Sequence, residues 1–471
     1  MTEANTTPRP ATRIERDSMG EMEVPADALW GASTQRAVLN FPISGQRMPR
    51  RIVRALGLIK RAAAEVNGEL GLLDPAVAAA IAEAAQEVAD GRWDDHFPVD
   101  VYQTGSGTST NMNANEVIAR LAAARVGRRV HPNDDVNRCQ SSNDVFPTAL
   151  QLAGALAIEE ELRPGLERLG AALGAKADEF WPIVKTGRTH LQDATPIRLG
   201  QEFRGYAGQV EASLRRVAAA LEELLAVPLG GTAVGTGINA HPEFAARACA
   251  RLADLTGLPV RETTNHFWAQ ASLDAVIAAH AGVRSAALSV WKIASDIRLM
   301  GMGPRAGLAE LALPETQPGS SIMPGKVNPV IVESTTMVVA RVVGNDATIA
   351  FAQTGSLLEL NVMLPVAGVA LVESIELLGR AARNLAERCV EGLRATERGP
   401  ALVEQGLMLA TALAPEIGYD AAAELAKEAY RTGRTIRELA LERGLAPERL
   451  DELLDPARMT EPGLGSGPVA G

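Results

Sequence analysis

Residues 273–297 read LDAVIAAHAGVRSAALSVWKIASDI, and this stretch decides the fold class. A helix built from it carries few charges on any face, so it must be buried in a large bundle or between subunits. The sequence therefore predicts a mainly α protein with a central bundle of five long helices, whose outer faces pack against other copies of the chain. The five predicted helices are Thr148–Trp181, Leu199–Val227, Ser272–Met300, Val330–Ala352 and Val366–Val390.

The rest of the chain divides around a bundle domain at 141–397. Residues 1–140 are expected to form a mixed helical and loop domain, in which 51–72 and 75–91 have helical spacing of their apolar positions. Residues 398–471 are expected to form a small C-terminal helical domain. Both ends of the chain are polar or rich in glycine and proline, so residues 1–12 and the tail from Glu461 are expected to be disordered.

The composition limits the possible partners. The chain has 471 residues, 46% of them hydrophobic, and a formal net charge of −11. Because it has no basic patch and no run of ~18 apolar residues, neither nucleic acid nor a membrane is an expected partner. Three widely spaced cysteines indicate reduced thiols of a cytoplasmic protein. Neither a metal-ligand cluster nor a cofactor motif is present, so we expect no metal and no cofactor.

Residues 319–328, GSSIMPGKVN, place hydroxyls, an ammonium and a carboxamide on one glycine-containing loop. Three interpretations compete. The loop can be a solvated turn between helices, which is the common fate of such a composition. It can be a phosphate-binding P-loop, but five residues separate its glycines and Val327 follows Lys326, so the required spacing is missing. The third interpretation is a loop that binds a carboxylate and stabilises its growing charge.

Four other segments are rich in hydrogen-bonding side chains. A turn can explain TGSGTST at 104–110. In SSN at 141–143, Ser142 and Asn143 are expected just before a helix with Pro147 in its first turn, so capping explains one of them but not the polar run from Gln140 to Asp144. His190 in TGRTHLQDATP, at 186–196, can be a structural histidine or a catalyst. GGTAVGTGIN at 230–239 is interpreted as a tight connection between helices. Together these segments indicate acid–base chemistry on a small carboxylate.

With these motifs in order, the chain resembles the class II fumarases of the fumarase/aspartase superfamily. The similarity covers roughly Arg13 to Met459, and GSSIMPGKVNP at 319–329 is its most specific motif. The resemblance implies a three-domain, mainly α fold and a homotetramer whose active sites are each shared by three chains. It also implies the reversible anti addition of water between fumarate and L-malate, a step of the tricarboxylic acid cycle, through an aci-carboxylate intermediate.

The resemblance implies roles for single residues as well. Ser320 corresponds to the base that takes the C3 proton, His190 to the acid that acts on the leaving hydroxyl, and Glu333 to the group that orients this histidine. The residues that correspond to the substrate-binding set are Ser106, Gly107, Thr108, Ser141, Ser142, Asn143, Thr189, Ser321, Lys326, Val327 and Asn328. A secondary dicarboxylate site corresponds to Arg128, His131, Pro132, Asn133 and Asp134.

Two alternatives stay open at this point. Aspartate ammonia-lyases belong to the same superfamily, but they typically carry glutamine at the position of His190, so this sequence favours water over ammonia. A structural protein that has lost its activity is the other alternative. The presence of Ser320, His190, Lys326 and Asn328 counts against it.

Overall fold

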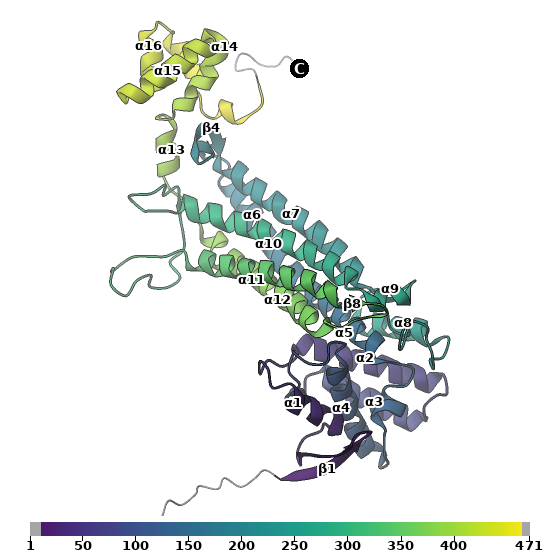
Figure 1. Cartoon of the computed structure of the whole chain (residues 1–471). Coiled ribbons are helices and arrows are strands. Elements are labelled where there is room, and N and C mark those ends of the chain that lie inside the picture. The colour runs from purple at the N-terminus through teal and green to yellow at the C-terminus, as the bar shows by residue number, and fades with distance from the viewer. Residues whose placement is uncertain (1–10, 464–471) are drawn as a thin grey trace, which may run out of the picture. The chain divides into compact units, whose positions relative to one another are not determined.

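The computed structural model describes residues 11–463, and the described chain is mainly helical (Figure 1). Disorder is expected at residues 1–12 and from Glu461 onward; residues 1–10 and 464–471 lie outside the described residues, and Thr12 already belongs to a strand. The chain forms two compact units, each assembled from three separate segments. Unit 1 comprises Met1–Arg163, Arg215–Ala286 and Ala340–Gly379, and unit 2 comprises Pro164–Leu214, Ala287–Val339 and Arg380–Gly471. The three-domain division stays a prediction.

The N-terminal part of unit 1 is a hairpin followed by packed helices. Strands β1 (Thr12–Asp17) and β2 (Gly20–Pro25) pair antiparallel. The partly buried carboxylate of Glu116 accepts hydrogen bonds from the backbone N–H groups of Gly31, Ser33 and Thr34, and so caps the first helix. The helices are α1 (Ala32–Asn40), α2 (Arg50–Glu69), α3 (Pro75–Ala89) and α4 (Thr108–Val126).

The next helix begins earlier than the sequence indicates. Helix α5 spans Ser142–Ala157, so the expectation that Ser142 and Asn143 precede the helix, with Pro147 in its first turn, is wrong. A π-helical turn, η3 (Ile158–Leu162), connects α5 to α6 (Arg163–Glu179). Pro164 lacks the N–H that would bond to the carbonyl four residues before it, and the wider turn accommodates that loss.

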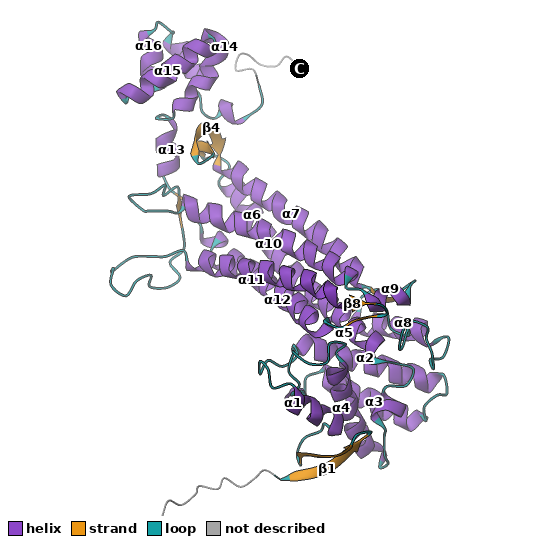
Figure 2. Ribbon diagram, viewed as in Figure 1, coloured by secondary structure: helices purple, strands orange, loops and turns teal. Residues whose placement is uncertain are grey.

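Four more long helices confirm the predicted architecture, and each has residues in both units. Within unit 1 their segments lie beside one another (Figure 2). Buried His280 joins three of them, because its ring nitrogens lie 2.8 Å from Asp346 Oδ1 and 2.9 Å from Ser374 Oγ. The long helices are α7 (Leu199–Leu224), α10 (Asp274–Met300), α11 (Val330–Ala352) and α12 (Leu364–Arg388). Shorter elements of unit 1 are β5 (Ala226–Val227), α8 (Phe244–Thr256), β6 (Arg261–Glu262), α9 (His266–Ala271), β8 (Ser356–Leu357) and β9 (Leu360–Asn361).

Unit 2 contains a hairpin, a short sheet and a C-terminal helical cluster. The hairpin pairs β3 (Val184–Thr189) with β4 (Gln192–Arg198), strands that the helical pattern around them does not indicate. Strand β7 (Leu311–Ala312) pairs with β10 (Arg394–Ala395). The C-terminal cluster consists of α13 (Arg398–Val403), η6 (Leu407–Leu413), α14 (Ala414–Ile417), α15 (Tyr419–Thr432), α16 (Ile436–Glu442) and α17 (Pro447–Leu453).

The C-terminal helices share a hydrophobic core of their own, centred on Leu413, Leu425, Ile436 and Leu450. Leu425→Ala should lower the free energy of unfolding of this cluster by about 2–5 kcal/mol, because a fully buried leucine leaves a cavity. Hydrogen exchange of the amides in 409–454 measures the change. Tyr430→Ala is the matched control, since Tyr430 lies on the same helix with 80% of its surface exposed. Equal effects of the two changes would contradict the assigned core.

Candidate active site

The segment at 104–110 forms a tight loop that leads into α4. Gly107 has φ +72°, and a Cβ there would lie 2.2 Å from the ring of Phe146. A Cβ on Gly105 would lie 1.8 Å from the carbonyl oxygen of Val362. Only glycine fits at these positions. The loop holds the hydroxyls of Ser106 and Thr108 2.8 Å apart at the N-terminus of α4.

The SSN segment forms the N-terminus of α5. Ser141 is the N-cap residue, and its hydroxyl accepts a hydrogen bond from the Asn143 N–H, so the cap is Ser141 rather than Ser142 or Asn143, the residues that the sequence indicates. The Ser142 hydroxyl accepts from Asn111 Nδ2 at 3.0 Å, which leaves its own O–H free to donate. Asn143 Nδ2 donates to the carbonyl oxygen of Ala233 at 2.9 Å.

Asp144 connects the start of α5 to the loop at 230–239. Its buried carboxylate accepts hydrogen bonds from the backbone N–H groups of Ser141, Gly230 and Thr232, each at 2.9 Å. Burial raises the pKa of Asp144, and the three N–H donors oppose that rise. The loop at 230–239 is therefore held against the SSN segment. Sequence reasoning missed this, and the available signal was the unbroken polar run from Gln140 to Asp144.

His190 lies at the tip of the hairpin in unit 2. Thr189 pairs with Gln192, so His190 and Leu191 form a two-residue turn, and both have positive φ, of 57° and 58°. This turn type matches the twist of a hairpin but normally favours glycine or asparagine. The two larger residues therefore carry backbone strain, and the His190 imidazole is exposed at the turn.

Buried ion pairs support the base of this hairpin. Glu310 lies just before β7, and its carboxylate is 3.1 Å from Lys185 Nζ and 2.9 Å from an Arg188 nitrogen. Lys185 also contacts Glu202 at 3.0 Å, and burial raises the pKa of Glu202. Because all these groups are largely withdrawn from water, the pairs hold the hairpin at a defined position.

The 319–328 loop is closed by its own hydrogen bonds. The N–H of Gly319 donates to the Lys326 carbonyl at 3.0 Å, and a Cβ at Gly319 would lie 2.2 Å from that oxygen. Lys326 Nζ donates to Asn328 Oδ1 at 2.7 Å. Most of the loop is exposed, including Ser321, Lys326 and Val327. The solvated-turn interpretation accounts for this exposure but not for the internal closure.

The Ser320 hydroxyl has an arrangement that suits a base. Its oxygen accepts hydrogen bonds from the backbone N–H groups of Ile322 and Met323, at 3.2 and 2.9 Å. Two such donors stabilise negative charge on oxygen, so they favour loss of the hydroxyl proton. Glu333, on the first turn of α11, is exposed, and no hydrogen bond among the described residues joins it to His190.

The residues of the expected secondary site lie at the turn after α4. His131 Nδ1 accepts hydrogen bonds from the N–H groups of Asn133 and Asp134, and so caps η2 (Pro132–Val136). Arg128 is 3.2 Å from the Asp74 carboxylate. The arrangement brings these side chains to one surface region of unit 1, where the guanidinium is already paired.

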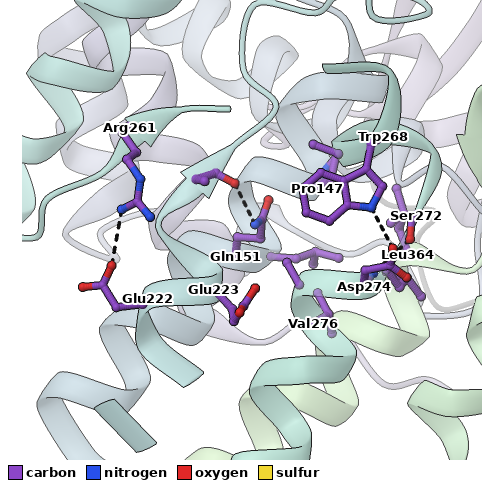
Figure 3. A pocket seen from close by; sticks show the side chains of 15 residues that line it. Pro147, Gln151, Glu222, Glu223, Arg261, Trp268, Ser272, Asp274, Val276 and Leu364 are labelled. Atoms are coloured by element: carbon purple, nitrogen blue, oxygen red, sulfur yellow. Dashed lines mark hydrogen bonds and ion pairs between the residues drawn. The ribbon is translucent and has the colours of Figure 1, made fainter. Parts of the chain in front are cut away.

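Unit 1 also contains a cavity of about 190 Å³. Figure 3 shows its polar pairs, in which Trp268 Nε1 donates to Asp274 at 2.7 Å and Gln151 Nε2 donates to the Ala226 carbonyl at 3.1 Å. Its lining includes Pro147, Leu150 and Val276 but none of the candidate site residues. This cavity therefore does not carry the chemistry that the loops indicate.

The mainly α fold, which carries hydroxyl, imidazole and ammonium groups on its loops, is that of a lyase. The family model described as Lyase matches residues 20–344, and that described as Fumarase C C-terminus matches 409–461. Fumarate hydratase class II of Methylorubrum extorquens is 53% identical over 97% of this chain and 98% of its own. The mitochondrial fumarate hydratase of Rattus norvegicus is 49% identical over 96% of this chain and 90% of its own.

Solved structures agree with these relatives. The class II fumarase of Schistosoma mansoni superposes with a TM-score of 0.93 at 38% identity, covering 96% of this chain and 99% of the other. The cobalt-bound fumarate lyase:delta crystallin of Brucella melitensis has a TM-score of 0.92 at 45% identity, covering 96% of this chain and 100% of the other. The chain belongs to the class II fumarate hydratase family. No helix among residues 11–463 is long and apolar enough to span a membrane.

Asp144→Asn tests the connection between α5 and the 230–239 loop. An amide in place of the carboxylate turns an NH₂ group toward at least one backbone N–H, and an unpaired buried donor costs about 1–3 kcal/mol. Chemical denaturation should show this loss of stability. Asp254→Asn, at an exposed position on α8, is the control and should be within ~0.5 kcal/mol of the wild type. Unchanged stability of Asp144→Asn would contradict the connection.

Proposed function

We propose that this chain interconverts fumarate and L-malate with Ser320 as base and His190 as acid. Fumarate hydratase activity follows from the family, and this conversion is a step of the tricarboxylic acid cycle. The observation that carries the assignment of the base is the pair of N–H groups on Ser320 Oγ. A serine base is difficult because forming an alkoxide costs much free energy, and these two N–H groups lower that cost.

In the malate-to-fumarate direction, the Ser320 alkoxide takes the proton from C3. The electron pair moves into the neighbouring carboxylate and forms the doubly charged aci-carboxylate. Lys326 and Asn328 supply the positive charge and the N–H donor that stabilise it. The C2–O bond then breaks, and protonated His190 gives its proton to the leaving hydroxyl, which departs as water. Hydration follows the same steps in reverse.

The carboxylates of the substrate are proposed to bind at the N-termini of α4 and α5. Free N–H groups and the helix dipole favour an anion at such a position. Thr108 and Ser142 begin these helices, and the free O–H of Ser142 can donate to a carboxylate oxygen. The mechanism uses side chains and backbone alone, so we propose no metal and no cofactor.

We further propose a homotetramer whose active sites are each built from three chains. Within unit 2, the hairpin that ends in β4 and the helix α11 are drawn at separate places (Figure 1). We propose that His190 and Ser320 of one site come from different chains, and that Glu333 of one chain orients His190 of another. Exposed apolar side chains on the long helices, among them Trp291, Met337 and Phe351, support burial against other copies.

The surface cluster of Arg128, His131, Asn133 and Asp134 is proposed as the secondary dicarboxylate site. The imidazole of His131 and the guanidinium of Arg128 are the groups proposed to bind the dicarboxylate, and Arg128 also forms an ion pair with Asp74. A cytoplasmic location is proposed from the free thiols of Cys139, Cys249 and Cys389.

Ser320→Ala and His190→Asn should each lower kcat by at least ~100-fold, the usual scale of a lost acid or base. Loss of fumarate's ultraviolet absorbance in buffer without ammonia measures hydration. His241→Asn removes a partly exposed imidazole elsewhere in the chain and should retain activity. Near-normal activity of either main variant would refute its role, and turnover of L-aspartate by the wild type would favour an ammonia-lyase.

Mixing the two inactive variants tests the shared site. If Ser320 and His190 of one site come from different chains, unfolding and refolding an equal mixture should restore about one quarter of the wild-type activity, because random assembly makes that share of sites intact. Each variant refolded alone is the control. No recovery from the mixture, with tetramers present by sedimentation, would place both residues of a site on one chain.

A further inference from the structure

The ammonium group of Lys60 is fully buried and is hydrogen-bonded to residues just before the SSN segment. Lys60, on α2, has 0% of its surface exposed, which is rare for a lysine unless it is paired. Its Nζ donates to Asn137 Oδ1 at 2.8 Å and to Gln140 Oε1 at 2.9 Å. Both acceptors are neutral amides, so the charge of Lys60 is solvated by hydrogen bonds without a direct ion pair.

The two amides connect Lys60 to the candidate binding groups. Asn137 Oδ1 also accepts from Asn111 Nδ2 at 3.3 Å, and the same Asn111 nitrogen donates to the Ser142 hydroxyl at 3.0 Å. Asn137 Nδ2 donates to the Gln140 carbonyl at 3.1 Å, directly before Ser141. The position of Ser142 thus depends on a hydrogen-bond network whose one cation is Lys60.

We propose that Lys60 is a positioning residue that holds the SSN segment and lends its positive charge to dicarboxylate binding at the N-terminus of α5. The proposal rests on the proposed substrate-binding role of that helix terminus. Lys60 does not touch the substrate; it acts through Asn137 and Asn111, and through its field in a region of low dielectric constant.

The surroundings decide when Lys60 is charged. From α5, Asp144 is the charged group whose field favours the ammonium. From α4, Asn111 and Asn115 are neutral, and the buried face of α3 consists of alanine, valine and isoleucine. The titratable group on the buried face of α8 is Cys249, and burial raises the pKa of its thiol to about 12, so it stays neutral. Cys139 lies buried in the loop before Ser141.

Burial lowers the pKa of Lys60 to about 7 from its ordinary 10.5. The free protein therefore carries the charge below about pH 7 and loses it above. A bound dianion favours the charged form, so binding raises this pKa and takes up a proton just above pH 7. Dicarboxylate affinity should accordingly fall as the pH rises through this range, by up to tenfold for each pKa unit of the rise on binding.

Calorimetric titration with succinate, a saturated dicarboxylate that cannot be hydrated, tests the proposal. Titrations of the wild type at pH about 8, in buffers with different heats of ionisation, should show proton uptake on binding. Lys60→Met should abolish the uptake and raise KM for malate at pH about 6 by up to ~10-fold, with a smaller effect on kcat. Lys427→Met, which removes an exposed lysine of α15, is the control and should keep the uptake.

No uptake by the wild type, or equal uptake by Lys60→Met, would overturn the proposal. If circular dichroism shows that Lys60→Met does not fold, Gln140→Met is the variant that tests the proposal. Removing one acceptor of Lys60 should lower the pKa of Lys60 further and move the proton uptake to lower pH. An unchanged pH dependence of the proton uptake would overturn the proposal. A failure of the proposed function can be distinguished from a failure of this proposal, because in that case the wild-type protein would not hydrate fumarate at any pH.

Discussion

The carboxylate of Asp144 receives three backbone N–H groups from two distant parts of the sequence, and the rest of the binding region is arranged around it. One N–H comes from the start of α5 and two come from the loop at 230–239. A buried charge is costly, and here those donors and the positive end of the helix offset the cost. The positive charge of Lys60 also stabilises the Asp144 carboxylate electrostatically. The position of the proposed carboxylate-binding groups is thus a consequence of burying two opposite charges beneath one helix N-terminus.

The proposed chemistry is divided between two kinds of structure. The binding groups of unit 1 begin long helices, where the backbone is rigid and the dipole already favours an anion. The proton-transfer groups of unit 2 lie on exposed turns: His190 on a two-residue hairpin turn, and Ser320 on a loop closed by Gly319. In the proposed tetramer these groups approach the substrate from another chain, so they have to lie at the surface of their own chain, and both turns are exposed.

Several features could be read from the sequence because they depend on local spacing. The long apolar helices follow from their periodicity, and the cap of α3 at Asp74 follows from the Asp-Pro pair. Other features could not. The hairpin around His190 has too few residues for a strand pattern to emerge from its helical surroundings, and the start of α5 at Ser142 was obscured by Pro147, which lies inside the helix. The loop at 230–239 was interpreted as a connection because its partner, Asp144, is far away in the chain.

The sequence by itself determined the helical architecture, the family and the residue types available for acid–base chemistry, since periodicity and short motifs are local properties. Only the tertiary structure decided which polar residues share a network. It placed Lys60 behind Ser142, two N–H groups on Ser320, and a buried carboxylate between two loops. The physical reason is that hydrogen bonds and desolvation depend on neighbours in space, and neighbours such as Lys60 and Gln140 are separated by many residues of chain.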